Sequence, residues 1–200
     1  MERILLFGGS FNPIHSGHIE IARRMSGKLG TDRIIFVPTG KSGYKETEDF
    51  ASRRDRLNMC KIALQDTNIE ISTVELDKEE QSYTYQTVQQ LKAENPDSKL
   101  YFLCGSDMFL TLHTWRNPKD IFKYSAMAVA LRGKDELELL EKYKKQYFAD
   151  FEIVLIDAGK IDVSSSQIRK AIRNGEKPIG ICDGVYDYII EKRLYIKSEK

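Results

Sequence analysis

The sequence lacks any long apolar run and any excess of one charge. No stretch approaches the roughly 20 apolar residues that a membrane-spanning helix needs, and the apolar residues 4–7 are too few for the core of a secretory signal peptide. The 31 Lys and Arg residues nearly balance the 30 Asp and Glu residues, for a net charge of +1. This balance disfavours a nucleic acid or an anionic membrane as a partner. We therefore expect a soluble, cytoplasmic protein.

Cysteine and histidine are also scarce. The three cysteines, Cys60, Cys104 and Cys182, are widely spaced and odd in number, which favours reduced thiols over a disulfide framework or a CxxC metal site. Three histidines, with no nearby cysteine or carboxylate set, do not predict a tetrahedral metal site. No GxGxxG fingerprint occurs. The Gly-Lys-Ser sequence at 40–42 is no phosphate loop, because Ile35 stands where that motif requires glycine.

What the sequence does contain is an alternation of strand-like and helix-like segments. Short apolar runs predict buried strands at residues 4–7, 33–37, 68–72, 100–104, 126–131 and 151–156. Amphipathic segments predict helices at 17–25, 52–64, 84–95, 136–148, 164–174 and 185–195, with a short helix before Trp115. Strands separated by helices favour a doubly wound α/β fold with a mostly parallel sheet. We expect a single domain over residues 1–200, with 176–200 as a helical C-terminal appendage.

The first twenty residues combine these signals into a phosphate site. The strand at 4–7 ends at Gly8 and Gly9, which let the backbone turn tightly and approach a ligand. The helix that follows presents unpaired N–H groups and the positive end of its dipole, and His15 and His18 lie at its start. An isolated pair of histidines more often caps a helix and packs in a core. Beside a glycine turn and a helix start, phosphate binding is the stronger interpretation.

Four motifs make the chain similar to a known family. Gly8–His18 (GGSFNPIHSGH) resembles the G-G-[ST]-F-[DN]-P-x-H-x-G-H signature of the HxGH nucleotidyltransferases, and Val163–Arg169 (VSSSQIR) resembles their I-S-S-[ST]-x-[IV]-R signature. Gly105–Asp107, with Trp115 eight residues on, and Ser82–Thr84 at a helix start resemble elements of the bacterial nicotinate mononucleotide adenylyltransferases. The phosphopantetheine adenylyltransferases and the cytidylyltransferases share the HxGH motif but lack these last two elements in this arrangement.

The resemblance implies a Rossmann-like nucleotidyltransferase fold and transfer of AMP from ATP to nicotinate mononucleotide, giving deamido-NAD and pyrophosphate. The nucleophile would be a phosphate oxygen that is largely ionised at neutral pH, so no general base is needed. The resemblance assigns catalysis to His15, His18 and Arg169. It assigns ATP binding to the first signature (Gly8, Gly9, Ser10, Phe11, His15, His18), to the end of a strand (Gly105, Asp107) and to the second signature (Ser164, Ser165, Ser166, Arg169). Mg²⁺ is expected as a cofactor, bound mainly through the ATP phosphates.

The mononucleotide side departs from the family pattern. The resemblance assigns Trp115 to stacking on the pyridine ring, Thr84 and Tyr85 to the pyridine carboxyl group, and Lys45, Asp107 and Arg132 to the ribose and phosphate. However, Ser42–Lys45 (SGYK) replaces Pro-Pro-His-Lys, and Asp77–Gln81 replaces a stretch that usually carries glycine and proline. Nicotinamide mononucleotide and phosphopantetheine are therefore alternative acceptors, and a non-catalytic nucleotide-binding sensor is a third alternative. A homo-oligomer is left open.

Overall fold

The fold is built on one parallel sheet. The computed structural model describes residues 1–41 and 50–196, and its strands lie in the order β3-β2-β1-β4-β5-β6. All neighbouring strands run parallel. The strands are β1 (Arg3–Gly9), β2 (Arg33–Pro38), β3 (Glu70–Ile71), β4 (Lys99–Gly105), β5 (Ala126–Leu131) and β6 (Ile153–Asp157). This order confirms the doubly wound α/β fold predicted from the alternation of segments.

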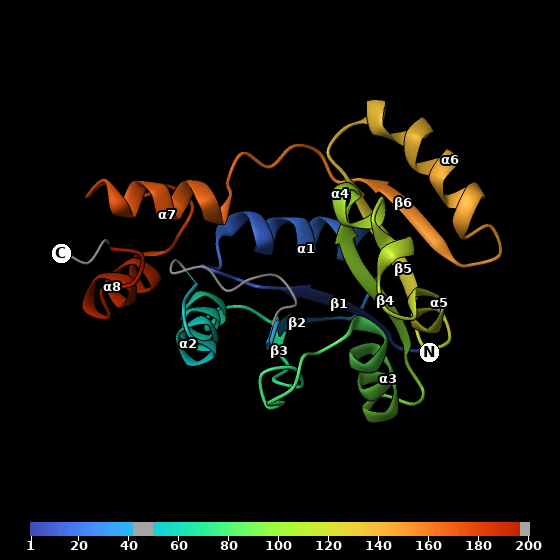
Figure 1. Cartoon of the computed structure of the whole chain (residues 1–200), viewed down its shortest axis with the longest axis horizontal. Helices are drawn as coiled ribbons and strands as arrows, with labels where there is room; N and C mark the ends of the chain where they lie inside the picture. Colours follow the sequence, from blue (N-terminus) through green and yellow to red (C-terminus); the bar gives the residue numbers. More distant parts are fainter. Residues whose placement is uncertain (42–49, 197–200) are drawn as a thin grey trace.

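Helices cover both faces of this sheet (Figure 1). The α-helices of the described residues are α1 (Ser16–Leu29), α2 (Arg53–Leu64), α3 (Thr84–Glu94), α4 (Ser106–Phe109), α5 (Pro118–Ile121), α6 (Leu137–Tyr147), α7 (Ser165–Arg173) and α8 (Asp183–Glu191). On one face Met25 of α1 packs in a cluster with Leu5, and on the other Val88 and Leu140 pack with Leu6. Successive residues of β1 therefore point to opposite, buried faces. In the part of the chain that the structure describes, no helix is long and apolar enough to cross a membrane.

The two central strands define where a ligand can bind. From β1 the chain passes through α1 to β2 on one side of the sheet, and it later returns to the other side of β1 as β4. In doubly wound sheets the crevice beyond the carboxyl ends of two such strands is the usual ligand site. Gly9 ends β1 and Gly105 ends β4. The topology thus brings two of the predicted ATP-binding segments to one edge of the sheet.

Several helix ends differ from the sequence prediction. Helix α1 continues past the predicted end at Met25 to Leu29, and Gly30 ends it in the left-handed conformation with a φ of 62°. The last turn escaped prediction because it is mostly polar. Helix α8 ends at Glu191 rather than at Tyr195, because Arg193 has a φ of 53°, which is incompatible with a right-handed helix.

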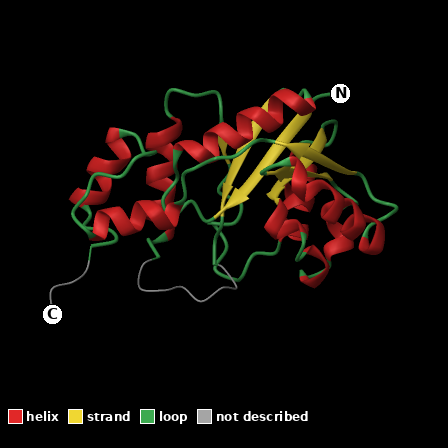
Figure 2. Cartoon of the chain, turned by 90° about the horizontal axis from the view of Figure 1, so that it is seen from above, coloured by secondary structure: helices red, strands yellow, loops and turns green. Residues whose placement is uncertain are grey.

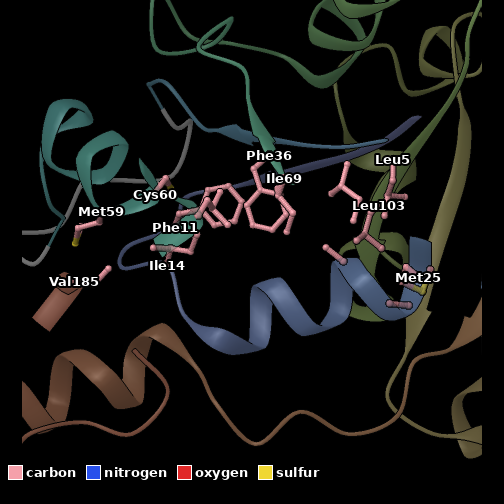
Figure 3. Close-up of a cluster of buried hydrophobic side chains, with 14 of the residues drawn as sticks. Leu5, Phe11, Ile14, Met25, Phe36, Met59, Cys60, Ile69, Leu103 and Val185 are labelled. Atoms are coloured by element: carbon pink, nitrogen blue, oxygen red, sulfur yellow. The ribbon is translucent and has the colours of Figure 1, made fainter. Parts of the chain in front are cut away.

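A second group of helices lies beside the sheet rather than over it, near the C-terminus (Figure 2). Helices α2, α7 and α8 gather there. Val185 of α8 belongs to the same buried cluster as Phe11 and Phe36 (Figure 3), as do Ile189 and Tyr195. Residues from the predicted C-terminal appendage thus contribute to a core that also contains β1 and β2. The division of the chain at residue 176 stays a prediction.

Two adjacent isoleucines of α8 test this division. Ile189 is fully buried, whereas Ile190 is 43% exposed. We expect Ile189→Ala to lower the free energy of unfolding by about 2–4 kcal/mol through the lost burial and the cavity left behind. Ile190→Ala is the matched control and should change it by less than about 1 kcal/mol. Urea unfolding measures both free energies through the fluorescence of Trp115, the single tryptophan. Trp115 packs on the opposite face of the sheet from the cluster that contains Ile189, so it reports on the rest of the domain. If Ile189→Ala left the Trp115 transition in place, the C-terminal segment would be a separate unit.

Candidate active site

The loop between β1 and α1 is anchored by aromatic packing. Phe11 has a left-handed backbone with a φ of 45°, and its buried ring stacks on Phe36 with 5.0 Å between the ring centroids. A Cβ at Gly9 would lie 3.2 Å from the Phe11 ring, so a glycine there lets the ring pack closely. Phe11 therefore holds the loop through its side chain. The predicted phosphate contacts of the backbone at Gly8, Gly9, Ser10 and Phe11 stay predictions.

His15 caps α1, and His18 lies in its first turn. The backbone N–H of His15 donates to Nδ1 of His18 at 3.2 Å, so a neutral His18 ring carries its proton on Nε2. The two imidazole rings stack with their centroids 3.7 Å apart. The ring of Phe11 packs edge-on against His18, with 5.0 Å between the centroids. Packing and one hydrogen bond therefore fix the direction of an N–H donor at the start of the helix.

Both histidines are neutral at pH 7 in the unliganded protein. Burial lowers the pKa of His15 to about 4. Burial, and then the neighbouring His15, lowers the pKa of His18 well below its ordinary value of 6.5. Nδ1 of His15 is buried and has no hydrogen-bond partner among the described residues. Because a nearby anion favours the protonated form, a phosphate bound here would raise both pKa values.

The second signature lies against the first. The hydroxyl of Ser164 caps α7 by accepting the backbone N–H of Gln167 at 3.3 Å. The Ser165 hydroxyl donates to the carbonyl of Pro13 at 2.9 Å, and Nη1 of Arg169 donates to the carbonyl of Asn12 at 2.7 Å. Nε of Arg169 is buried without a partner among the described residues. Segments more than 150 residues apart in sequence thus form one site, with an unused guanidinium donor.

Sequence reasoning missed the residue that joins these parts. The Oδ1 atom of buried Asn12 accepts the backbone N–H of Ala51 at 3.0 Å and the hydroxyl of Tyr195 at 2.8 Å. Its carbonyl accepts from Arg169. Asn12 thus connects the loop after β1 with the start of α2, with α7 and with the segment after α8. Its position inside the first signature was the available signal, but its role was not predicted.

Sequence reasoning also missed Arg56. Its side chain is fully buried, and it donates to the carbonyls of Ser10 at 2.8 Å and Thr39 at 2.6 Å, with longer bonds to those of Gly40 and Ala51. The signal was a charged residue on an apolar helix face, since Arg56 lies three and four residues before the buried Met59 and Cys60. A buried charge needs such partners.

The predicted acceptor residues lie along the ends of β4 and β5 and the start of α3. Asp107 lies in the short helix α4 that follows β4, and its carboxylate accepts from the Arg132 guanidinium at 3.4 Å; both side chains are exposed. Trp115 is half-buried. The neighbouring Arg116 lies over the ring of Tyr83, 5.1 Å from its centroid, directly before Thr84 at the start of α3.

Tyr85 and Lys45 are the remaining residues predicted to bind the acceptor. The ring of Tyr85 is half-buried and packs against the apolar cluster on the α3 face of the sheet, and its contact with the acceptor stays a prediction. Lys45 lies outside the described residues.

Among the residues that the structure describes, no group of three or more His, Cys, Asp or Glu side chains could hold a metal ion.

Comparison with known proteins places the chain in a family. A family model described as cytidylyltransferase-like matches residues 6–171, a range that contains both signatures. The chain belongs to the cytidylyltransferase-like family. A relative from Clostridium tetani, named "Probable nicotinate-nucleotide adenylyltransferase", is 35% identical over 179 residues, with 88% of this chain and 90% of the relative covered. A relative of the same name from Neisseria meningitidis serogroup B is 34% identical over 202 residues, with 98% and 100% covered.

Solved structures of this cytidylyltransferase-like fold include the Plasmodium falciparum nicotinic acid mononucleotide adenylyltransferase complexed with NaAD. It is 25% identical to this chain, covers 98% of each chain and superposes with a TM-score of 0.78. The nucleotidyltransferase fold expected from the two signatures is therefore confirmed. Family membership makes the protein an enzyme that transfers nucleotidyl groups. The roles of its individual residues stay predictions.

The glycine between the two histidines gives a sharp test of this cytidylyltransferase-like site. A Cβ at Gly17 would lie 2.7 Å from Cγ2 of Ile161 and 2.9 Å from Nδ1 of His15. Gly17→Ala should displace the His15 ring and weaken binding of a non-hydrolysable ATP analogue by about tenfold or more, as measured by calorimetry. Gly27→Ala in the same helix meets nothing within 4 Å and should raise stability by about 0.5–1 kcal/mol with unchanged affinity. Equal affinities for both variants would refute the steric assignment.

The neutral histidines also predict a dependence of stability on pH. Because the folded pKa of His15 is about 4 and the unfolded value is about 6.5, the unfolded chain binds more protons between these values. His15 therefore contributes a loss of stability as the pH falls from about 6.5 to 4, with a slope of up to about 1.4 kcal/mol per pH unit.

Urea unfolding at a series of pH values measures this slope. His15→Asn should show a shallower slope than the wild type across this range. His113→Asn, which replaces an exposed histidine, is the matched control. Identical slopes for the two variants would contradict the buried, neutral state of His15.

Proposed function

We propose that the protein is an adenylyltransferase that transfers AMP from ATP to nicotinate mononucleotide and releases deamido-NAD and pyrophosphate. The observation that carries this proposal is the contact between the two signatures, which gathers two neutral imidazoles, a capped helix start and the Arg169 guanidinium at one end of β1. The relatives at 34–35% identity that carry this activity in their names support the choice of acceptor.

The ATP side supplies donors for charge that develops during transfer. In the proposed step a phosphate oxygen of the mononucleotide attacks the α-phosphorus of ATP, a new P–O bond forms, and the bond to the departing pyrophosphate breaks. His18 would donate its Nε2–H to the α-phosphate, and His15 would donate to a neighbouring phosphate. Arg169 and the hydroxyls and N–H groups of Ser164–Ser166 would bind the pyrophosphate as its charge grows. Holding the two polyanions in line accounts for the rest of the catalysis.

Mg²⁺ fits this donor set as an ion carried by the nucleotide. The side chains gathered around the first signature are imidazoles, hydroxyls and a guanidinium, which can donate to phosphate oxygens, whereas Mg²⁺ prefers carboxylate, phosphate and water oxygens. When bound, Mg²⁺ neutralises phosphate charge and favours departure of pyrophosphate. His15, His18 and Arg169 would then bind the phosphate oxygens that the ion leaves available.

The acceptor side offers one residue for each part of the mononucleotide. Trp115, which is half-buried and precedes the Arg116 that lies over Tyr83, would stack on the pyridine ring, and the first residues of α3 would bind the carboxyl group at a helix N-terminus. Arg132, held near Asp107, would approach the acceptor phosphate, and Asp107 the ribose. Lys45, outside the described residues, is assigned to the phosphate by sequence alone.

Release of pyrophosphate tests the chemistry and the acceptor together. The wild type should release pyrophosphate from ATP faster with nicotinate mononucleotide than with nicotinamide mononucleotide or phosphopantetheine. Preference for another member of this panel would change the acceptor and keep the reaction. Calorimetric ATP binding without pyrophosphate release for any acceptor would instead indicate a nucleotide sensor.

His18→Ala tests the assigned catalytic role. Loss of a donor to the transition state should lower kcat by about 10²–10³-fold while the ATP analogue still binds. His113→Ala, on the far side of the sheet against Tyr143 of α6, is the control and should retain wild-type turnover. Near-normal kcat in His18→Ala would remove His18 from the mechanism.

A further inference from the structure

The segment that follows β2 is held to the acceptor side by a buried carboxylate. Glu75 is 9% exposed, and one of its oxygens, Oε1, accepts the hydroxyl of Thr87 at 2.7 Å. The other, Oε2, accepts the backbone N–H of Gly40 at 3.4 Å. Thr87 is itself buried in the second turn of α3. Glu75 therefore joins the helix that begins at Thr84 to the backbone that leads into residues 42–49.

The two backbones that Glu75 joins are in direct contact. A Cβ at Gly40 would lie 2.1 Å from the carbonyl oxygen of Glu75 and 3.4 Å from the hydroxyl of Ser82. Lys41 and Gln81 form an isolated parallel β-bridge immediately beside this point. The Ser82 hydroxyl oxygen is buried without a partner among the described residues. The turn after β2 and the approach to α3 thus share one interface, and only a residue without a side chain fits at position 40.

The same glycine is also connected to the ATP side, through a different residue. Arg56 donates to the carbonyls of Thr39 and Gly40 and to that of Ser10 in the loop after β1. Arg56 therefore touches both halves of the site, whereas the hydrogen bonds of Glu75 go to Gly40 and Thr87. We therefore expect a change at Arg56 to affect the binding of both substrates, and a change at Glu75 to affect mainly the acceptor.

We propose that Glu75 is a positioning residue for the acceptor: it fixes the turn at Gly40 against the start of α3, the helix end that would bind the pyridine carboxyl group. The proposal rests on the proposed function for the identity of the acceptor. Both carboxylate oxygens are needed as acceptors. Burial raises the pKa of Glu75, and the charges of the nearby Lys78 and Arg56 oppose that rise.

Steady-state kinetics of Glu75→Gln measure the predicted effect. A glutamine amide keeps the shape but has one acceptor oxygen in place of two, so it cannot reproduce both the bond from the Gly40 N–H and the bond donated by the Thr87 hydroxyl. We expect the KM for nicotinate mononucleotide to rise about tenfold, with the KM for ATP changed less than about twofold. Glu79→Gln, an exposed glutamate four residues along the same connector, is the matched charge control and should behave as the wild type. By contrast, Arg56→Lys should raise both KM values.

Thr87 gives a second pair of variants in case Glu75→Gln fails to fold. Thr87→Val removes the hydroxyl at nearly constant volume and should raise the acceptor KM, while Thr87→Ser keeps the hydroxyl and should restore it. The double variant Glu75→Gln/Thr87→Val should be no worse than the more affected single variant, because both remove the same contact. Unchanged KM values, or equal rises for ATP and acceptor in Glu75→Gln and Thr87→Val, would overturn the proposal.

Hydrogen exchange separates this proposal from the proposed function. In unliganded Glu75→Gln, amides near Gly40 and Gln81 should exchange faster than in the wild type, with those of residues 8–18 unchanged. If the wild type released no pyrophosphate with nicotinate mononucleotide, the proposed function would fail, and the KM comparison would be made with the acceptor that the wild type does use. Unchanged exchange near Gly40 would remove the positioning role whatever the acceptor.

Discussion

The buried guanidinium of Arg56 is the constraint on which the active-site edge of this protein depends. Where β1 and β2 end, the chain continues as turns whose backbone carbonyls have left the strand ladder. Arg56 supplies donors to those of Ser10 and Thr39, and to that of Ala51 before α2. A planar guanidinium offers five N–H groups in fixed directions, and a buried charge is costly without partners. The three turns are therefore held in one mutual geometry, which Asn12 and Glu75 extend toward the two substrates.

The phosphate-binding groups proposed at the start of α1 carry little positive charge in the absence of a ligand. His15 and His18 are neutral, so the start of α1 does not hold two like charges in stacked rings. Arg169 provides a permanent charge, and its Nε has no hydrogen-bond partner among the described residues. Phosphate binding would bring negative charge to rings that can then gain protons. Donors preorganised in this way need little rearrangement as charge moves from the α-phosphate to pyrophosphate.

The sequence was sufficient for the fold class and for the two signatures, and insufficient for the contacts that join them. Buried strands such as Ala126–Leu131 read as uninterrupted apolar runs because both faces of a parallel sheet are covered. The Ser164 cap of α7 and the positive φ of 75° at Gly175, directly after its end, follow from local rules for helix ends. By contrast, the partners of Arg56, Asn12 and Glu75 are backbone groups and distant side chains. Periodicity carries no information about such pairs, and a charged residue reads as exposed unless its helix face is considered.

The hydrogen bond between Tyr195 and Asn12 spans 183 positions of the chain, and those from Ser165 and Arg169 span 152 and 157. During synthesis, β1 and α1 leave the ribosome long before the residues that complete their site. A nascent chain with the whole sheet but without α7 would have the HxGH loop and lack the guanidinium that binds beside it. The site that we propose is in this sense a property of the finished molecule, because a copy without α7 lacks the Arg169 donors assigned to the pyrophosphate.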